Sequence, residues 1–235
     1  MSVNKKLCVS IPLFDGELDI IESKIDSLQK QSISFFEFRF DFLKEYDKLD
    51  KILEVISKHK NQSIYTLRPT NEGGQFPGNE SERLTLLKKL ALAEPMMLDL
   101  EYRAVSKNNE FADFIDNNNV RNLISWHDFT GTPDKEFMVD LIDNMRVFSN
   151  YVKIVTTAKS IDDSINILGL YKLIDSGINL VAFSMGELGI ISRVLCSIVG
   201  NSPFTYTTIE KPVSPGQLTI NQMKSIYSLF HNRLI

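Results

Sequence analysis

A lysine, Lys153, lies in the middle of an apolar run that has the composition of a buried β-strand. The run is YVKIVTT, residues 151–157, and Val152 and Ile154 flank the lysine. Lysine is seldom fully buried, because an isolated ammonium in an apolar interior is costly. Two explanations are open. The side chain reaches solvent and pairs with a carboxylate, or its neutral amine, which desolvation and nearby cations both favour, is used as a nucleophile.

Other ionisable residues occupy one face of short apolar runs. In FFEFRFD, residues 35–41, alternate phenylalanines share one strand face, while Glu37, Arg39 and Asp41 share the other. The phenylalanines are expected to pack beneath helices, so the charged face should point toward the interior. The same alternation directs further ionisable residues inward on four more runs: Arg68, Asp99, Glu101, His127 and Lys153. Opposite charges gathered in this way predict a polar active site, in which His127 can act as a general acid and base.

Each of these residues also has a structural explanation. His127 could be a hydrogen-bonded histidine at a strand end, and Glu37, Arg39, Asp99 and Glu101 could form an ion-pair network. Arg193 could be a solvated helix residue. The glycines of NEGGQFPG, residues 71–78, could form only a flexible turn, although a mobile active-site loop is at least as consistent with their position. His59 and His231 fall late in helical stretches and are expected at the surface.

The composition excludes several classes of function. A chain of 235 residues with a net charge of −4 and a pI near 5.5 has no basic cluster for nucleic acid or an anionic membrane. Its two cysteines indicate a reduced compartment and match no metal-binding spacing. No apolar run is long enough to span a membrane, and the first apolar run is too short for a signal peptide. A cytoplasmic, soluble protein is therefore expected.

The elements that must position these residues alternate along the whole chain. Eight β-type runs, at residues 7–11, 33–40, 63–68, 96–101, 121–127, 151–157, 179–185 and 204–209, are each followed by a stretch with helical periodicity. Eight such units in about 250 residues are typical of an α/β protein with a (β/α)₈ TIM barrel, in which functional groups gather at the carboxyl ends of the strands. An open doubly wound sheet is the second possibility. No linker is evident, so residues 1–235 are expected to form a single catalytic barrel domain.

Seven motifs along this pattern resemble those of type I 3-dehydroquinate dehydratase, the Schiff-base-forming enzyme of the shikimate pathway. They are EFRFD, TLRPTNEGG, DLE, SWHDFTGTP, VKI, SMGELGIISR and SPGQ, in the family's order and at about its spacing. The resemblance implies a (β/α)₈ barrel, usually a homodimer, that converts 3-dehydroquinate to 3-dehydroshikimate without metal or organic cofactor.

The resemblance also implies a role for individual residues. The Schiff-base lysine falls on Lys153, the general acid–base histidine on His127, and the glutamate that orients the histidine on Glu72. Substrate-binding positions fall on Glu37, Arg39, Arg68, Arg193 and Gln217, with Ser10 and Met185 lining the site. In two places the chain departs from the family. Trp126 replaces a frequent tyrosine and is expected to point outward, and Val213 replaces a frequent hydroxyl residue, for which the next residue, Ser214, is a candidate substitute.

Two other functions are compatible with parts of this pattern. A class I aldolase-like barrel would share the lysine and the fold but would cleave a carbon–carbon bond and would usually need a phosphate site. The segment TTIEKPVSPGQ, residues 207–217, has no clear glycine-rich phosphate cradle. A non-catalytic ligand-binding barrel should have lost the lysine or the histidine, and this chain has both. The dehydratase is therefore the preferred hypothesis.

Overall fold

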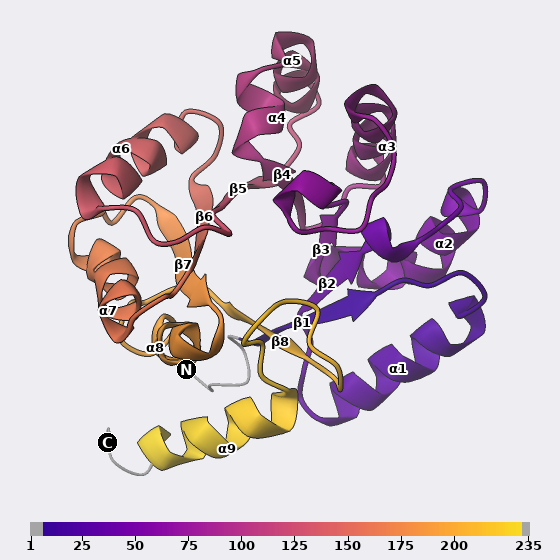
Figure 1. The fold of residues 1–235 in the computed structure, drawn as a ribbon. Coiled ribbons are helices and arrows are strands. Elements are labelled where there is room, and N and C mark those ends of the chain that lie inside the picture. Colours follow the sequence, from indigo (N-terminus) through magenta and orange to yellow (C-terminus); the bar gives the residue numbers. More distant parts are fainter. Residues whose placement is uncertain (1–6, 232–235) are drawn as a thin grey trace. The chain divides into compact units, whose positions relative to one another are not determined.

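The computed structural model describes residues 7–231, apart from the side chains of residues 18, 19 and 231 (Figure 1). The expected alternation of strands and helices is confirmed in this range. The strands are β1 (Leu7–Pro12), β2 (Phe36–Arg39), β3 (Ser63–Thr66), β4 (Met97–Glu101), β5 (Asn122–His127), β6 (Tyr151–Thr157), β7 (Asn179–Met185) and β8 (Thr205–Thr208).

At least one α-helix follows each strand. The α-helices are α1 (Leu18–Lys30), α2 (Leu49–Ile56), α3 (Glu80–Leu92), α4 (Tyr102–Ser106), α5 (Asn109–Asn117), α6 (Lys135–Met145), α7 (Ile161–Gly169), α8 (Ile190–Leu195) and α9 (Ile220–His231). Capping boxes begin two of them, with Asn79 and Glu82 at α3 and Ser160 and Asp163 at α7. None of the described helices is both long and apolar enough to cross a membrane.

The chain divides into two compact units whose boundaries lie inside β1 and β5. We call residues 11–124 the arginine unit. The remainder, up to Ser10 and from Ser125 onward, is the lysine unit, because it contains Lys153. Since each boundary cuts a strand, β1 and β5 contribute residues to both units.

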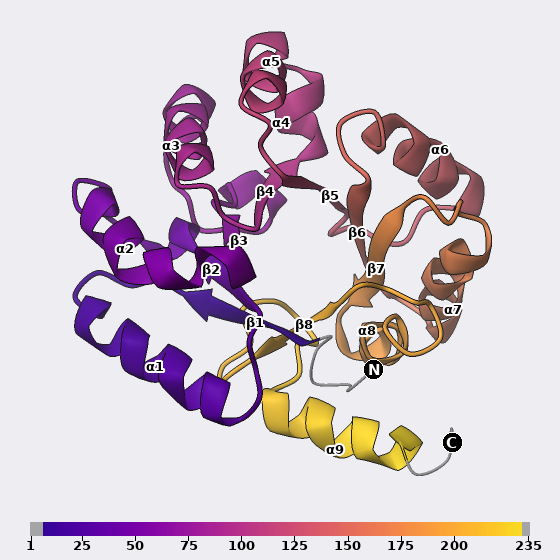
Figure 2. The same cartoon turned by 180° about the vertical axis from the view of Figure 1, so that it is seen from behind.

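In the arginine unit, parallel pairing connects the first half of the strands. Phe36 of β2 pairs with Ser63 of β3, and Ile64 of β3 pairs with Met97 of β4. At one side the Leu13 N–H donates to the Arg39 carbonyl at 3.1 Å. Helix α1 packs beside α2, as Figure 2 also shows. These contacts hold β2, β3 and β4 in sequential order.

The phenylalanine face of β2 is buried, as the alternation predicts. Phe36, Phe38 and Phe40 are inaccessible to solvent, and both Phe38 and Phe40 contact the Tyr65 ring edge-on. The surface location expected for His59 is wrong. Its ring contacts Phe36, with 6.1 Å between ring centroids, and only 6% of the residue is exposed. A short 3₁₀ helix, η3 (Ser57–Gln62), follows α2 and turns this histidine inward. The side chain of His231 lies outside the described residues.

In the lysine unit, the longest parallel ladder joins β6 to β7. It runs from Tyr151↔Asn179 to Thr157↔Met185, and α7 and α8 pack against β7 (Figures 1 and 2). Strand β1 pairs with β8 from Leu7↔Thr205 onward. Strands β7 and β8 meet through Phe183 and Tyr206, whose ring centroids are 6.2 Å apart.

The hydrogen-bonded strand order is β7-β6-β5-β4-β3-β2-β1-β8. Each strand neighbours the one that precedes or follows it in the chain, and the last strand pairs with the first. In an open doubly wound sheet, the order in which strands are added reverses at an internal strand, and the first strand does not pair with the last. The order therefore excludes that alternative and confirms the (β/α)₈ fold.

Two strand ends differ from those expected. Strand β2 ends at Arg39, and Phe40–Phe42 form a 3₁₀ helix, η2, so Asp41 is not a strand residue. This turn allows the Asp41 carboxylate to fold back onto the Arg39 guanidinium. Arg68 similarly lies two residues beyond β3 rather than within it. Both differences come from polar residues that pair with groups outside the strand ladder.

Candidate active site

The side chain of Lys153 remains inside the protein. The residue is 4% exposed, so the alternative in which the lysine reaches solvent is wrong. Its Nζ lies 3.5 Å from the Tyr206 hydroxyl and 4.7 Å from the centroid of the Tyr206 ring. The ring face of an aromatic residue attracts a cation, and the hydroxyl oxygen accepts a hydrogen bond from nitrogen. Tyr206 on β8 therefore contacts the Lys153 amine of β6 through both its hydroxyl and its ring.

A polar loop follows His127 at the end of β5. The Asp128 carboxylate accepts hydrogen bonds from the backbone N–H of Thr130 at 2.7 Å and of Gly131 at 3.2 Å, which makes a tight Asx-type turn. The Asp128 N–H donates to the Val155 carbonyl of β6 at 2.8 Å. This backbone hydrogen bond therefore joins the loop after His127 to β6, the strand that contains Lys153. The Trp126 ring contacts Phe137 of α6, which confirms its outward direction.

Arg193 lies in α8, the helix after β7, and is not a solvated residue as its alternative explanation required. It is 1% exposed, and its guanidinium carbon lies 4.2 Å from the centroid of the Phe183 ring. Burial lowers the pKa of Arg193 to about 10. Among the described residues, its Nε has no hydrogen-bond partner. Such a guanidinium is suited to receive a carboxylate.

The loop that contains SPGQ closes over Arg193. The Arg193 Nη2 donates to the Ser214 hydroxyl at 3.2 Å and to the Pro215 carbonyl at 3.3 Å. Gly216 has φ +73°, and a Cβ there would lie 2.4 Å from the Gly186 carbonyl oxygen, so only glycine fits this approach. The loop therefore brings the Ser214 hydroxyl, rather than Val213, to the arginine.

Three further candidate residues of the lysine unit are buried. The Gln217 amide donates through Nε2 to the Ser10 hydroxyl at 3.2 Å and accepts from the Val213 N–H at 2.9 Å. Met185 lies at the end of β7, beside Thr157 of β6. The structure thus brings Gln217 and Ser10 together and places Met185 at the carboxyl end of its strand.

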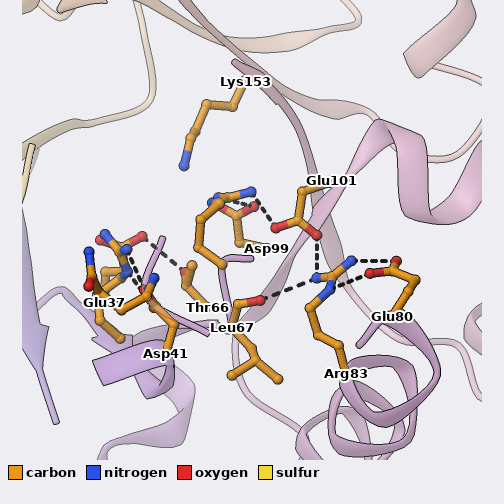
Figure 3. Close-up of polar contacts among 12 residues, drawn as sticks. Glu37, Asp41, Thr66, Leu67, Glu80, Arg83, Asp99, Glu101 and Lys153 are labelled. Atoms are coloured by element: carbon orange, nitrogen blue, oxygen red, sulfur yellow. Dashed lines mark hydrogen bonds and ion pairs between the residues drawn. The ribbon is translucent and has the colours of Figure 1, made fainter. Parts of the chain in front are cut away.

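In the arginine unit, Arg68 belongs to a buried network of alternating charges. Figure 3 labels its other members, Asp99, Glu101, Arg83 and Glu80. Its guanidinium contacts Asp99 at 2.7 Å and Glu101 at 2.6 Å. Arg83 of α3 contacts the other oxygen of Glu101 at 2.5 Å and also binds Glu80. Burial lowers the pKa of Arg68, but the two carboxylates outweigh it and the pKa is raised. The ion-pair explanation of Asp99 and Glu101 is therefore confirmed.

Arg39 and Glu37 are also held by close polar partners. Two nitrogens of Arg39 donate to the two oxygens of Asp41, both at 2.8 Å, and the Thr66 hydroxyl donates to Glu37 at 2.9 Å. Burial lowers the pKa of Arg39, and the Asp41 charge more than reverses the effect. Arg39 is therefore a paired cation, whose remaining N–H groups have defined directions.

The glycine loop after Arg68 folds back onto the strand end. The Phe76 N–H donates to the Arg68 carbonyl at 3.2 Å, and Gly73 has φ +75°. Glu72, at the end of the 3₁₀ helix η4 (Thr70–Glu72), is partly buried. Burial raises the pKa of Glu72 to about 7, and the nearby Glu101 carboxylate acts in the same direction. The mobility expected of this loop stays a prediction, but its glycines have a defined steric role.

Sequence analysis did not identify two residues of these networks, Arg83 and Tyr206. Arg83 shares a helix face with Leu87 and Leu90, so a charge on an apolar stripe was a usable signal. Tyr206 lies in FTYTTI, where nothing local distinguishes it from an ordinary strand aromatic. Within residues 7–231, the structure has no group of three or more histidine, cysteine or acidic residues placed to hold a metal ion.

The glycine loop generates a steric prediction. A Cβ on Gly74 would lie 2.0 Å from the Arg68 carbonyl oxygen, whereas a Cβ on Gly177 meets nothing within 4 Å. Gly74→Ala should therefore lower the free energy of unfolding by about 2 kcal/mol or more, because the loop must move off Arg68. Gly177→Ala, the matched control, should change it by less than about 1 kcal/mol. Urea unfolding followed by circular dichroism measures both, and equal effects would contradict the close approach.

Glu72 generates a prediction for the dependence of stability on pH. The pKa of Glu72 is about 7 in the folded protein, above its ordinary value of 4.5, so the folded state binds more protons than the unfolded state between these values. The free energy of unfolding should therefore decrease as pH rises from about 4.5 to 7. The loss should be on the order of 2 kcal/mol for a partly buried group. Glu72→Gln cannot titrate, so the difference in unfolding free energy between wild type and variant should fall across this range. A pH-independent difference would show that Glu72 titrates normally.

Comparisons with known proteins agree with this geometry. The family model of type I 3-dehydroquinase matches residues 7–233. The chain is 34% identical over 212 residues to the 3-dehydroquinate dehydratase of Pyrococcus abyssi, covering 90% of this chain and 94% of that protein. It is 37% identical over 206 residues to the enzyme of the same name from Dehalococcoides mccartyi, covering 86% and 89%.

A solved structure shows the same fold. The type I 3-dehydroquinate dehydratase of Clostridium difficile, crystallised with covalently modified comenic acid, superposes with a TM-score of 0.81 at 23% identity, covering 97% of this chain and 93% of that one. At this identity the likeness supports the fold, whereas the family match and the closer sequence relatives carry the assignment. The chain therefore belongs to the type I 3-dehydroquinase family, a family of 3-dehydroquinate dehydratases.

Proposed function

We propose that this protein dehydrates 3-dehydroquinate to 3-dehydroshikimate in the shikimate pathway through a Schiff base on Lys153. The observation that carries the proposal is the burial of Lys153 inside β6, with its Nζ against Tyr206. A buried amine in a family of ketone-converting enzymes is best explained as a nucleophile. The proposal treats residues 1–235 as a single catalytic domain that works without metal or organic cofactor.

The first step is attack of the neutral Lys153 amine on the C3 ketone of the substrate. The ketone oxygen is protonated and leaves as water, and the nitrogen becomes an iminium joined to C3. The iminium withdraws electrons from the neighbouring C2–H bond, which lowers the barrier to its deprotonation. The positive nitrogen formed in this step would remain over the Tyr206 ring, where a cation is favoured.

His127 is assigned the proton transfers of the second step. As a general base it takes the proton from C2, which converts the iminium to an enamine. As a general acid it returns that proton to the departing C1 hydroxyl, so that water is lost and the iminium forms again on the product. Hydrolysis of this iminium takes up one water, releases 3-dehydroshikimate and a proton, and restores the neutral Lys153 amine. The Asp128 turn, fastened to β6, gives the histidine a defined place relative to the lysine strand. We assign Glu72 the orientation of the histidine ring.

Arg193 is assigned the substrate carboxylate. Its buried Nε has no hydrogen-bond partner among the described residues, and its pKa is lowered to about 10 by burial, so an anion would relieve an unfavourable desolvation. Guanidinium also offers the paired donors that match a carboxylate. The Ser214 hydroxyl, Gln217 with its partner Ser10, and Met185 would complete this side of the substrate.

Glu37, Arg39 and Arg68 are assigned the remaining polar contacts to the substrate. Arg39 is paired with Asp41, and Arg68 with two carboxylates. Their proposed role is therefore to present oriented N–H donors to the substrate. Glu37, whose carboxylate accepts a hydrogen bond from Thr66, is assigned a contact to a ring hydroxyl of the substrate.

The assembly and location of the protein remain part of the proposal. Family membership supports a homodimer, as the resemblance implies, and the acidic composition with two buried thiols supports a cytoplasmic location. Size-exclusion chromatography with light scattering would test the dimer directly, since a mass near 26.8 kDa is that of a single chain.

Covalent capture tests the assignment of Lys153. Borohydride added during turnover of 3-dehydroquinate should reduce the iminium and fix the ligand mass on the peptide that contains Lys153. Lys153→Ala should abolish both labelling and activity, whereas Lys159→Ala, a change just beyond the end of the same strand, should keep both. Peptide mass spectrometry identifies the labelled residue, and label on any other lysine would exclude this mechanism.

A substitution of His127 tests whether Schiff-base formation and dehydration depend on different residues. Because His127 is assigned only proton transfer, His127→Ala should still form the Schiff base but should lose about 10²–10⁴-fold in the rate of dehydration. The rate is followed by the absorbance of the conjugated enone product, and the Schiff base by borohydride capture. Turnover within a few-fold of wild type would mean that another residue is the base.

A further inference from the structure

We propose that Tyr206 is the residue that positions the Lys153 amine for Schiff-base formation, through its hydroxyl and its ring together. The proposal rests on the proposed function of Lys153 and adds a residue to it. The Lys153 Nζ donates a long hydrogen bond of 3.5 Å to the Tyr206 hydroxyl and lies 4.7 Å from the ring centroid. Both residues are 4% exposed, so water does not screen the interaction.

The aromatic ring of Tyr206 is itself held by neighbours in the lysine unit. Its centroid lies 5.5 Å from that of Phe204 and 6.2 Å from that of Phe183, in edge-on arrangements. Phe183 in turn lies under Arg193, with 4.2 Å between the guanidinium carbon and the ring centroid. The Lys153 nitrogen and the Arg193 guanidinium therefore lie over two aromatic rings, Tyr206 and Phe183, that contact each other.

The two contacts of Tyr206 serve different stages of the reaction. In the neutral amine, an N–H group held by the hydroxyl oxygen leaves the nitrogen lone pair directed away from Tyr206, where a ketone can be attacked. After attack and loss of the ketone oxygen as water, the iminium nitrogen keeps one hydrogen and carries positive charge. That hydrogen can still be donated to the hydroxyl, and the ring face stabilises the charge. Long hydrogen bonds in a free enzyme commonly shorten in the reacting complex.

The hydroxyl and the ring can be separated by substitution. Tyr206→Phe removes the hydroxyl and keeps the ring, and Tyr206→Leu removes both. Tyr227→Phe removes the hydroxyl of another buried tyrosine of the lysine unit and is the matched control. Each change is made in the His127→Ala background, in which the proposed function predicts that the reaction stops at the Schiff base. The rate of capture on Lys153 at saturating 3-dehydroquinate is then measured by rapid quenching into borohydride and intact mass.

We expect Tyr206→Phe to slow capture about tenfold, because a hydrogen bond to a charged or developing charged group is lost. Tyr206→Leu should slow it further. Tyr227→Phe should stay within about twofold of the parent variant, because its hydroxyl contacts Ser197 and Val194. Thermal unfolding of Tyr206→Phe, which keeps the packing, provides the check on folding.

The outcomes separate this inference from the proposed function. If the parent variant labels Lys153 and Tyr206→Phe labels it at the same rate, the role of the hydroxyl is wrong while the Schiff base stands. If Tyr227→Phe slows capture as much as Tyr206→Phe, the effect is general packing and the inference also fails. If the parent acquires no label on Lys153, the proposed function itself is wrong.

Discussion

The cost of burying charge is the constraint on which the rest of this structure depends. A guanidinium or ammonium removed from water needs compensation, and the interior of this protein contains several such groups. The arginine unit compensates its cations with carboxylates, in the pairs of Arg39 with Asp41 and of Arg68 with Asp99 and Glu101. In the lysine unit, the contacts of Lys153 and Arg193 include aromatic faces and hydroxyl groups.

These two forms of compensation have different chemical consequences. A carboxylate neutralises an arginine and directs its remaining N–H groups, so the paired arginines become rigid donors with little net charge. An aromatic face attracts a cation without neutralising it, and it leaves the nitrogen able to react or to receive an anion. The pKa values follow this division, since that of Arg68 is raised by its carboxylates and that of Arg193 is lowered by burial. The guanidinium of Arg193, which is suited to receive an anion, therefore belongs to the lysine unit.

Much of this arrangement could be predicted from local pattern. In β2, phenylalanines alternate with charged residues, and this alternation was sufficient to predict that Glu37 and Arg39 point inward. The position of Lys153 between Val152 and Ile154 was sufficient to identify it as a candidate catalytic residue. The partners of these groups could not be predicted in the same way. Tyr206 is 53 residues from Lys153 in the chain, and the pairing of Arg83 with Glu101 requires α3 and β4 to be in place. His59 was misplaced because the end of its helical stretch turns inward as a 3₁₀ helix.

The central claim is that Lys153 and Arg193 of the lysine unit bind the same substrate molecule. A crystal structure of the protein after borohydride reduction in the presence of 3-dehydroquinate tests it most directly. The account predicts a bond between Nζ of Lys153 and C3 of the ligand, with the ligand carboxylate on the guanidinium of Arg193. A ligand bound through Lys153 whose carboxylate lies on another cation, with the Arg193 guanidinium still donating to Ser214 and Pro215, would contradict it.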